Sequence, residues 1–491
     1  QDESAFWRIK GGDTLVIGQG SYKMGIGAPN TAWCSTDWSW ACRLPPLPSG
    51  PDPAHPTRIV GKGWQTGCRH KPQLWGTERA ETVIDLTNTS NACLECLEIT
   101  DHSSCANDHC RSSVRCQRNR FPYGKYADVG IYAADSSNVT LQNLNIHGLA
   151  WAGVHAGRLS HWTVKHVRLA GNGGVGWDGD IGRNSGNRGR VTFRRLKVEW
   201  NGCPETFPSL EYAHCWGQET CGGYGDGVGL ARSGGRWLIE DSVFRYNVSD
   251  GLDLLYLGVD HPDSFAQIRR SKAYGNGGNQ MKIGGAATIE NSLIVSNCGF
   301  FHGRPFGQDM GNLDSGDHCR AGGAAVSFSL GRGKTASMVN STVAGQGWAL
   351  VETGCNTHDF PEEPACDGSE EVILHNNIFR GFQVCYLGYK RLTDFVGDGD
   401  PDHFTSAPGV DYNVIFNSEI PSPIGPRNLL KNPLLMRSNI NAFDGRLQGR
   451  SPAIDTGLAV GSAGGLIPDH DIEGTPRPQG NGVDRGAYEY H

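Results

Sequence analysis

The chain has 491 residues, with 44 Lys and Arg against 51 Asp and Glu and a formal net charge of −7 at pH 7. Its 69 glycines are about 14% of the chain, roughly twice the usual share, and charged residues are only 19%. The acidity argues against bulk binding to nucleic acid, and no apolar run approaches the ~20 residues of a membrane-spanning helix. Few long charged stretches are present, which excludes a coiled coil or helical bundle.

The 16 cysteines lie in polar segments rich in Gly, Asp and Asn. Their even number indicates disulfides formed in an oxidising compartment. Cys93 and Cys96 have the spacing of half a zinc site, but no second pair follows at finger spacing, so zinc is the weaker interpretation. The chain opens at Gln1 rather than Met, as expected for the mature form of a secreted protein.

Short segments with apolar residues at alternate positions recur along the chain, the closest starting 23 residues apart at 139 and 162. They are VTLQNLNI (139–146), WTVKHVRL (162–169), VTFRRLKV (191–198), WLIEDSVF (237–244), QIRRSKAY (267–274), TIENSLIV (288–295), SMVNSTVA (337–344) and VILHNNIF (372–379). Most are followed by an Asn or Gly turn and an apolar triplet, including GVH (153–155), GVG (227–229), GLD (251–253), QMK (280–282), AVS (325–327) and ALV (349–351). No amphipathic helix separates them, so the pattern predicts an all-β protein, a parallel β-helix with disulfide-stapled loop insertions.

The β-helix is expected to span residues 1–390. A cysteine-rich loop insertion is expected at about 87–125 and a second insertion at 203–221. Residues 391–491 are rich in Pro, Asp and Asn, and are expected to form an irregular C-terminal segment that packs on the β-helix.

Stacked coils allow neighbours to be predicted by aligning the triplets. The alignment gives two columns, one of Asp226, Asp250 and Asn279 and one of Gly229, Asp253 and Lys282. Adjacent coils lie about 4.8 Å apart, so Asp226, Asp250 and Asp253 should converge on one outward patch with Lys282 one coil further. Carboxylates this close repel one another unless a cation lies among them, and hard oxygen ligands select Ca²⁺. Asp226 and Asp250 also suit Asp-Gly turns, but Asp253 lies inside an apolar run and is not a turn residue.

The segment NVSDGLDLLYLG (247–258), followed by AYGNGGNQMKIGG (273–285), resembles polysaccharide lyase family nine. These are secreted right-handed β-helix enzymes that cleave uronate polysaccharides such as pectate. The resemblance implies that Asp226, Asp250 and Asp253 bind calcium and that Lys282 is the Brønsted base. One position departs from the family, because Ser249 replaces the first Asp of an Asp-Asp pair. The resemblance is close over the third to fifth coils and elsewhere concerns the fold.

The residue types suit β-elimination independently. Ca²⁺ on a uronate carboxylate neutralises its charge and stabilises the carbanion formed when H5 is removed. A lysine beside that cation has its ammonium form disfavoured, which suits a base at alkaline pH. The alternative is that Lys282 forms only a structural salt bridge with Asp253.

Other candidates have less support. His155 and Asp178 are expected near the Lys282 column one or two coils earlier. Arg183, His214 and Arg232 are candidates for binding substrate carboxylates. Tyr212 and Trp216, in the insertion 203–221, either stack on a sugar or cap the loop.

We therefore expect a secreted, calcium-dependent lyase that acts on an acidic polysaccharide, as a monomer without a nucleic-acid partner or a membrane span. A glycoside hydrolase on the same fold is one alternative, with a carboxylate pair as acid and nucleophile or base, but it leaves Lys282 unexplained. The other is a non-catalytic β-helix, a surface, structural or carbohydrate-binding protein, which has no need for a base beside a metal.

Overall fold

The computed structural model describes residues 6–25, 28, 44–76, 80–103, 127–182, 185–212, 215, 225–301, 323–356, 364–384, 391–398, 409–420 and 424–491. The described residues divide into two compact units, unit 1 up to Gly235 and unit 2 from Arg236 on. Within the described ranges, no helix combines the length and the hydropathy that crossing a membrane requires.

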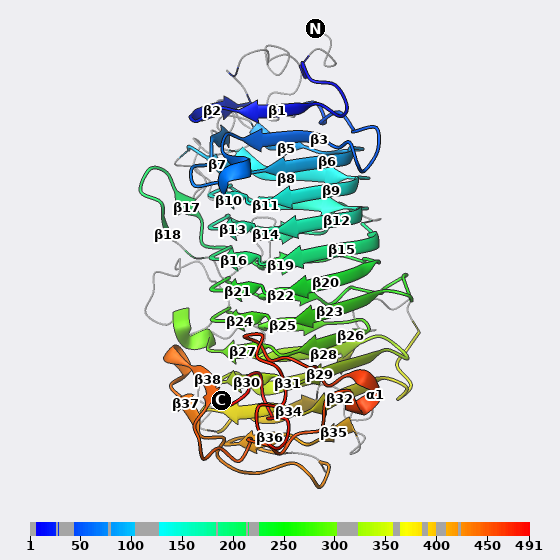
Figure 1. Ribbon diagram of the computed structural model, residues 1–491, viewed down its shortest axis with the longest axis vertical. Coiled ribbons are helices and arrows are strands. Elements are labelled where there is room, and N and C mark those ends of the chain that lie inside the picture. The colour runs from blue at the N-terminus through cyan, green and yellow to red at the C-terminus, as the bar shows by residue number, and fades with distance from the viewer. Residues whose placement is uncertain are drawn as a thin grey trace. The chain divides into compact units, whose positions relative to one another are not determined.

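Unit 1 is built from parallel strands that follow one another through three sheets, so that a full coil contributes one strand to each (Figure 1). Sheet A holds β1 (Thr14–Ile17), β3 (Thr57–Gly61), β6 (Ser90–Glu95), β9 (Ser137–Gln142), β12 (Ser160–Lys165) and β15 (Arg188–Arg194). Sheet B holds β2 (Ser21–Met24), β4 (Gln73–Gly76), β7 (Glu98–Asp101), β10 (Asn145–His147), β13 (Arg168–Ala170) and β16 (Lys197–Glu199). Sheet C holds β5 (Ala80–Asp85), β8 (Ala127–Ala134), β11 (Ala152–Gly157), β14 (Val175–Asp178) and β19 (Val228–Gly229). The described part of unit 1 also contains a 3₁₀ turn, η3 (Trp64–Thr66), and an antiparallel hairpin formed by β17 (Glu205–Thr206) and β18 (Glu211–Tyr212).

Unit 2 repeats the same arrangement. Its sheet A holds β20 (Arg236–Glu240), β23 (Phe265–Arg269), β26 (Ala287–Glu290), β29 (Thr335–Val339), β32 (Glu371–His375) and β35 (Val410–Asp411). Its sheet B holds β21 (Val243–Arg245), β24 (Lys272–Tyr274), β27 (Leu293–Ser296), β30 (Thr342–Gly345), β33 (Ile378–Gly381) and β36 (Val414–Phe416). Its sheet C holds β22 (Leu252–Leu254), β25 (Met281–Ile283), β28 (Val326–Leu330), β31 (Ala349–Cys355) and β34 (Asp394–Asp398). The other elements in the described residues of unit 2 are η4 (Cys298–Phe301), β37 (Leu435–Arg437), η9 (Ile440–Ala442), β38 (Asp444–Leu447) and α1 (Ser462–Gly465).

The prediction of an all-β parallel β-helix is confirmed, and its cause is the period-two pattern of the sequence. In sheet A of unit 2, Ile239, Ile268, Ile289 and Met338 occupy equivalent positions on successive strands and are fully buried. In sheet C, Leu252, Met281, Val326 and Val351 form a second buried row. Residues between these positions face outward, and this alternation decides which side chains can meet a ligand.

Asparagines fix the turn that leads from sheet B to sheet C. The buried Asn276 accepts hydrogen bonds at its Oδ1 from the Asn247 backbone N–H at 3.0 Å and from Asn247 Nδ2 at 2.8 Å. Its own Nδ2 donates to the Phe244 carbonyl at 3.1 Å and to Gln280 Oε1 at 2.9 Å. In unit 1, Asn172 donates to Asn201 in the same way, at 2.9 Å. These stacked amides satisfy buried backbone groups and fix the start of the strand that carries Lys282.

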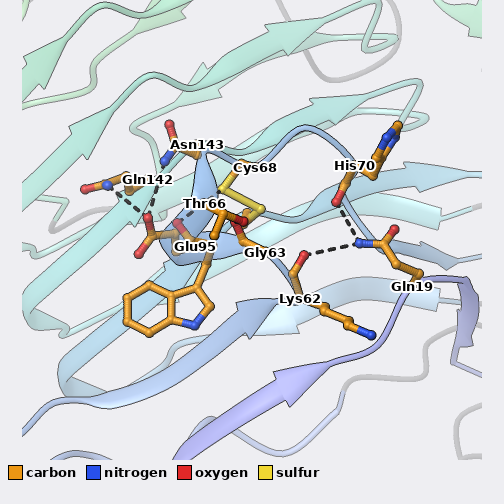
Figure 2. The surroundings of a disulfide bond; sticks show 11 residues. Gln19, Lys62, Gly63, Thr66, Cys68, His70, Glu95, Gln142 and Asn143 are labelled. Atoms are coloured by element: carbon orange, nitrogen blue, oxygen red, sulfur yellow. Dashed lines mark hydrogen bonds between the residues drawn. A yellow bond between two sulfur atoms is a disulfide. The ribbon is translucent and has the colours of Figure 1, made fainter.

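Three disulfides lie within the described part of the chain: Cys68–Cys96, Cys203–Cys215 and Cys355–Cys366. Around the first, Gln19 bridges the carbonyls of Lys62 and His70, and Glu95 accepts hydrogen bonds from Gln142 and Asn143 (Figure 2). Because Cys96 is joined to Cys68, it does not pair with Cys93 as a zinc ligand. Among the described residues Cys93 is a buried thiol outside any disulfide, and burial raises its pKa to about 11.

Two boundaries differ from those expected. Strands β6 and β7 occupy residues 90–101 of the segment assigned to the first insertion, and they pair with the coils on both sides, β6 with β3 and β9 and β7 with β4 and β10. The rest of that insertion, 104–126, lies outside the described residues. Coil strands also continue past residue 390 to β36, and the chain after β36 packs on unit 2. There Ile472, Ala487 and Tyr488 cover Leu293, Val295 and Ala344 of sheet B.

Candidate active site

Asp250, Asp253 and Lys282 come together on the outer face of sheet C in unit 2. Strands β22 and β25 pair so that Asp253 lies opposite Lys282. The residues on either side of each, Leu252 and Leu254 in β22 and Met281 and Ile283 in β25, are fully buried. Their burial turns Asp253 and Lys282 to the outer face.

Lys282 lies between the two carboxylates. Its Nζ is 3.7 Å from Asp250 Oδ2 and 3.6 Å from Asp253 Oδ2, and the three side chains are 24%, 9% and 15% exposed, respectively. Each aspartate uses its other oxygen to hold the backbone. Asp250 Oδ1 accepts the Asn279 N–H at 2.6 Å, and Asp253 Oδ1 accepts the Leu255 N–H at 2.8 Å. Both Oδ2 atoms are thereby aimed at Lys282.

A glycine makes room for Asp250. A side chain at Gly278 would collide with Asp250 Oδ1, so this carboxylate requires a residue without a Cβ at that position. The neighbouring Ser249, which departs from the Asp-Asp motif discussed in the sequence analysis, is buried, and its carbonyl accepts the Gly278 N–H at 2.9 Å.

The side-chain oxygens of Asp250, Asp253 and Asn279 are of the type that binds a hard cation. Among the described residues, no three His, Cys, Asp or Glu side chains form a ready-made metal cluster. However, Asn279 Oδ1 is buried without a hydrogen-bond partner, and the backbone of the same residue is held by Asp250. Two carboxylates and an orphaned amide oxygen are donors of the kind that Ca²⁺ prefers. The third predicted ligand, Asp226, belongs to unit 1.

In unit 1, Asp226 lies just before β19 and is buried. Its Oδ2 is 3.2 Å from where a Cβ at Gly229 would stand, so the carboxylate covers that glycine on the outer side of β19. Gly229 pairs with Asp178 of β14, and Asp178 pairs with His155 of β11. Asp226, Asp178 and His155 therefore belong to one outward column of sheet C in unit 1.

His155 is surrounded by aromatic rings. Its ring centroid is 4.6 Å from that of Trp151 and 5.3 Å from that of Tyr132, both edge-on. Its Nε2–H donates to the Asp180 carbonyl at 2.5 Å and lies 3.7 Å from Asp178 Oδ2. Burial raises the pKa of Asp178 to about 7, although the Asp180 N–H bonds to it. This column thus holds a carboxyl that titrates near neutral pH.

The other predicted residues are placed elsewhere in unit 1 or not described. Tyr212, on the hairpin strand β18, accepts a hydrogen bond from Arg168 Nη2 at 2.8 Å and stacks on Trp200 at 5.1 Å, contacts that hold the hairpin on sheet B. Arg232 is half-buried after β19. Arg183, His214 and Trp216 lie outside the described residues. Substrate binding by these three residues, Tyr212 and Arg232 stays a prediction.

The residue that the sequence pattern missed is Glu352. The column that contains Asp253 and Lys282 continues through Ser327 of β28 to Glu352 of β31. Burial raises the pKa of the Glu352 carboxyl, while a hydrogen bond from Ser327 and the charge of Lys282 lower it. Aligning the triplets AVS (325–327) and ALV (349–351) residue by residue places Val351 opposite Ser327, whereas the structure pairs Val351 with Val326. The register of β31 differs by one residue from this alignment, and for that reason Glu352 was not assigned to the Lys282 column.

Comparisons with known proteins give the fold. A sequence model described as the right-handed β-helix region matches residues 129–310. No curated protein matches the chain.

Several solved structures are similar. The pectate lyase Pel9A is 12% identical, over 99% of this chain and 89% of that one, with a TM-score of 0.44. An alginate lyase from Paenibacillus sp. str. FPU-7 is 13% identical, over 82% and 96%, with a TM-score of 0.40. An endo-xylogalacturonan hydrolase from Aspergillus tubingensis is 10% identical, over 76% and 91%, with a TM-score of 0.31. At these identities and scores the likenesses do not assign an activity to this chain.

Proposed function

We propose that the protein is a secreted polysaccharide lyase that cleaves a uronic-acid-containing polysaccharide by β-elimination. The observation that carries the proposal is Lys282, an outward lysine that lies within 4 Å of two carboxylates on the rigid face of sheet C. Support for secretion comes from the disulfides, which persist in oxidising compartments.

The chemical step assigns one role to each side chain. The free amine of Lys282 takes the H5 proton of a uronate, and the C5–H electrons form a C4=C5 double bond. The C4–O4 bond breaks, and its electron pair leaves on O4, which takes a proton from water to become the hydroxyl of the released chain. The oxygens of Asp250, Asp253 and Asn279 in unit 2 would hold Ca²⁺. Calcium binding by Asp226, which lies in unit 1, stays a prediction from the sequence. When bound, Ca²⁺ neutralises the substrate carboxylate and compensates Asp250 and Asp253, which otherwise favour the charged form of Lys282.

The direct experiment is an absorbance assay for the unsaturated product. The protein is incubated at mildly alkaline pH with a panel of uronate polysaccharides, first with calcium and then with chelator, while reducing ends are counted in parallel. The proposal predicts ultraviolet absorbance that rises with calcium and stops with chelator. If reducing ends appear without ultraviolet absorbance, the protein cleaves by hydrolysis and the lyase proposal is contradicted.

A glycoside hydrolase is the second candidate, and unit 1 provides the observation that favours it. Asp178, with a pKa raised to about 7, suits a general acid, and Asp226 supplies a carboxylate beside its register partner Gly229. In that case Asp178→Asn abolishes the release of reducing ends and Lys282→Ala does not.

A further inference from the structure

The Lys282 column of unit 2 does not end at Glu352. Glu352 pairs with Gly397 of β34, one strand further along sheet C. A side chain at Gly397 would collide with the six-membered ring of Trp348, so that ring lies over Gly397 on the face to which Glu352 points. The backbone of Trp348 is held in place because its carbonyl accepts the Asp394 N–H at 2.9 Å.

This arrangement has the composition of a sugar-binding surface. Trp348 is half-buried and covers Gly397, which leaves part of a flat ring on the outer face of the sheet. Glu352, on the strand next to Gly397, offers a carboxyl group that accepts hydrogen bonds from hydroxyls. Ligand sites commonly combine an aromatic wall with a few fixed polar groups of this kind.

The charges on this face indicate which sugar fits. Asp250 and Asp253 already face the single ammonium of Lys282. Glu352 adds a third carboxylate, near enough to Lys282 and Asp250 for their charges to act on it. A uronate placed on Trp348 would meet Glu352 at close range, and like charges repel. A neutral sugar would meet the same group as a hydrogen-bond acceptor.

We propose that Trp348 and Glu352 form a sugar-binding subsite beside Lys282 that accepts a neutral sugar ring in preference to a uronate. The part of this inference that names the polymer rests on the proposed function: the substrate would then carry neutral sugars next to its uronates. The subsite itself rests only on the geometry of unit 2.

The test is titration calorimetry with two matched probes, oligogalacturonate in which part of the carboxyls have been reduced to alcohols and the unmodified oligogalacturonate. Lys282→Ala serves as the parent protein so that neither probe is consumed. The parent is expected to bind the partly reduced probe more tightly. Glu352→Gln, which keeps the shape of the side chain and removes the charge, is expected to raise affinity for the unmodified probe at least fivefold and to change affinity for the partly reduced probe by less than twofold.

Trp348→Ala is expected to weaken binding of both probes at least tenfold, while Trp348→Phe, which keeps a flat ring, retains most of the affinity. Trp64→Ala, a half-buried tryptophan of unit 1, is the control and should leave both affinities unchanged. Thermal unfolding of each variant distinguishes lost binding from lost folding. If Trp348→Ala does not fold, the affinities of Trp348→Phe for the two probes are compared with those of the parent instead.

The inference is overturned if Trp348→Ala folds and binds both probes like the parent, if Glu352→Gln leaves the preference between probes unchanged, or if neither probe binds. Failure of the proposed function has a different signature. If no unsaturated product is detected but the probes bind with the predicted differences, the lyase activity is contradicted and the subsite is supported. If Trp348→Ala in the otherwise native chain forms unsaturated product at the parental rate, the lyase activity is supported and the subsite is contradicted.

Discussion

Asp250 and Asp253 each divide their two oxygens between a backbone N–H and the Lys282 ammonium. The backbone bonds fix both carboxylates before any ligand arrives, which lowers the entropic cost of binding a cation. Without a cation, two carboxylates stabilise the charged form of Lys282, and that form cannot accept a proton. Calcium binding by Asp250 and Asp253 would therefore change the protonation of Lys282, whose Nζ lies 3.7 and 3.6 Å from their Oδ2 atoms.

Replacing Asp253 by Asn removes one negative charge and keeps the shape of the side chain. Calcium affinity measured by calorimetry is expected to fall more than tenfold, because a single charge at about 4 Å in a partly exposed site contributes on the order of 4 kcal/mol. Asp263→Asn, at an exposed position of unit 2, is the control and should leave affinity unchanged. Equal calcium affinity of Asp253→Asn and the parent protein would contradict the assignment of Asp253.

A second buried charge cluster, in unit 1, links protonation to stability. His147 Nδ1 is 2.7 Å from Glu205 and its Nε2 is 3.0 Å from Glu98. Burial alone would lower the pKa of His147, but the hydrogen bonds and charges of the two glutamates outweigh burial and raise it to about 9. The folded protein thus binds this proton more tightly than the unfolded chain, where the pKa is about 6.5.

The resulting stabilisation is complete below pH 6.5 and is lost as the pH rises through about 9. Its size is on the order of 3 kcal/mol. Urea unfolding of the parent followed from pH 6 to pH 10 should show this loss, and His147→Gln should show a flatter profile because it carries no proton to lose. Identical profiles for the two proteins would mean that His147 is not the group responsible.

At the scale of elements, the alternating segments determine most of what can be predicted. Each segment aligned from the sequence became a strand of sheet A and its continuation in sheet B, because a period of two with one face buried fits only a strand. The triplets specify sheet C less well, because each holds only one or two inward residues. At β31 both Leu350 and Val351 are apolar and fully buried, and only hydrogen bonding to β28 decides that Val351 faces Val326.

Short or atypical strands also explain why the ends of the first insertion and of the β-helix were predicted at other residues. Strands β6 and β7 lie among cysteines, which in the sequence look like loop residues, although Cys93 and Cys96 are buried in the coil. The last coils hold short strands, β35 of two residues and β36 of three, which are too short to show a period. The position of Trp348 over Gly397 depends on a close approach between two strands and leaves no trace in either segment alone.

The turn asparagines can be tested directly. Asn276→Ala removes four hydrogen bonds from a fully buried position and leaves the backbone N–H of Asn247 without its acceptor. The free energy of unfolding is expected to fall by about 1–3 kcal/mol or more. Asn441→Ala, at an exposed position in unit 2, is the control and should change it by less than about 0.5 kcal/mol. Chemical denaturation measures both, and equal stabilities would show that the amide stack does not hold the turn.

At the scale of the molecule, disulfides supplement a core that each coil builds from only a few side chains. Cys355–Cys366 closes a segment of 11 residues next to the strand that carries Glu352, and Cys203–Cys215 closes one of 12 residues around the hairpin. Cys355 ends the strand that carries Glu352, and Cys203 and Cys215 flank the hairpin that carries Tyr212, so each disulfide joins two points of the chain next to a residue discussed above.

Replacing Cys355 and Cys366 by Ala is expected to lower the free energy of unfolding by roughly 2–4 kcal/mol, since the unfolded chain regains the freedom of that loop. Differential scanning calorimetry of parent and variant, each with and without reductant, measures the change. Reductant should lower the melting temperature of the parent more than that of the variant. A parent that melts at the same temperature with and without reductant would contradict a stabilising role.

The most direct test of the proposed chemistry compares two lysines that lie one strand apart in the chain. Lys282→Ala removes the outward lysine of β25, and Lys272→Ala removes a half-buried lysine of β24 in sheet B. With the uronate polymer that gives the strongest calcium-dependent absorbance, Lys282→Ala is expected to lower kcat by roughly 10²–10⁴, the usual contribution of a general base, while Lys272→Ala stays within twofold of the parent. If Lys282→Ala instead forms unsaturated product at the parental rate, Lys282 is not the base, and its contacts with Asp250 and Asp253 are structural salt bridges.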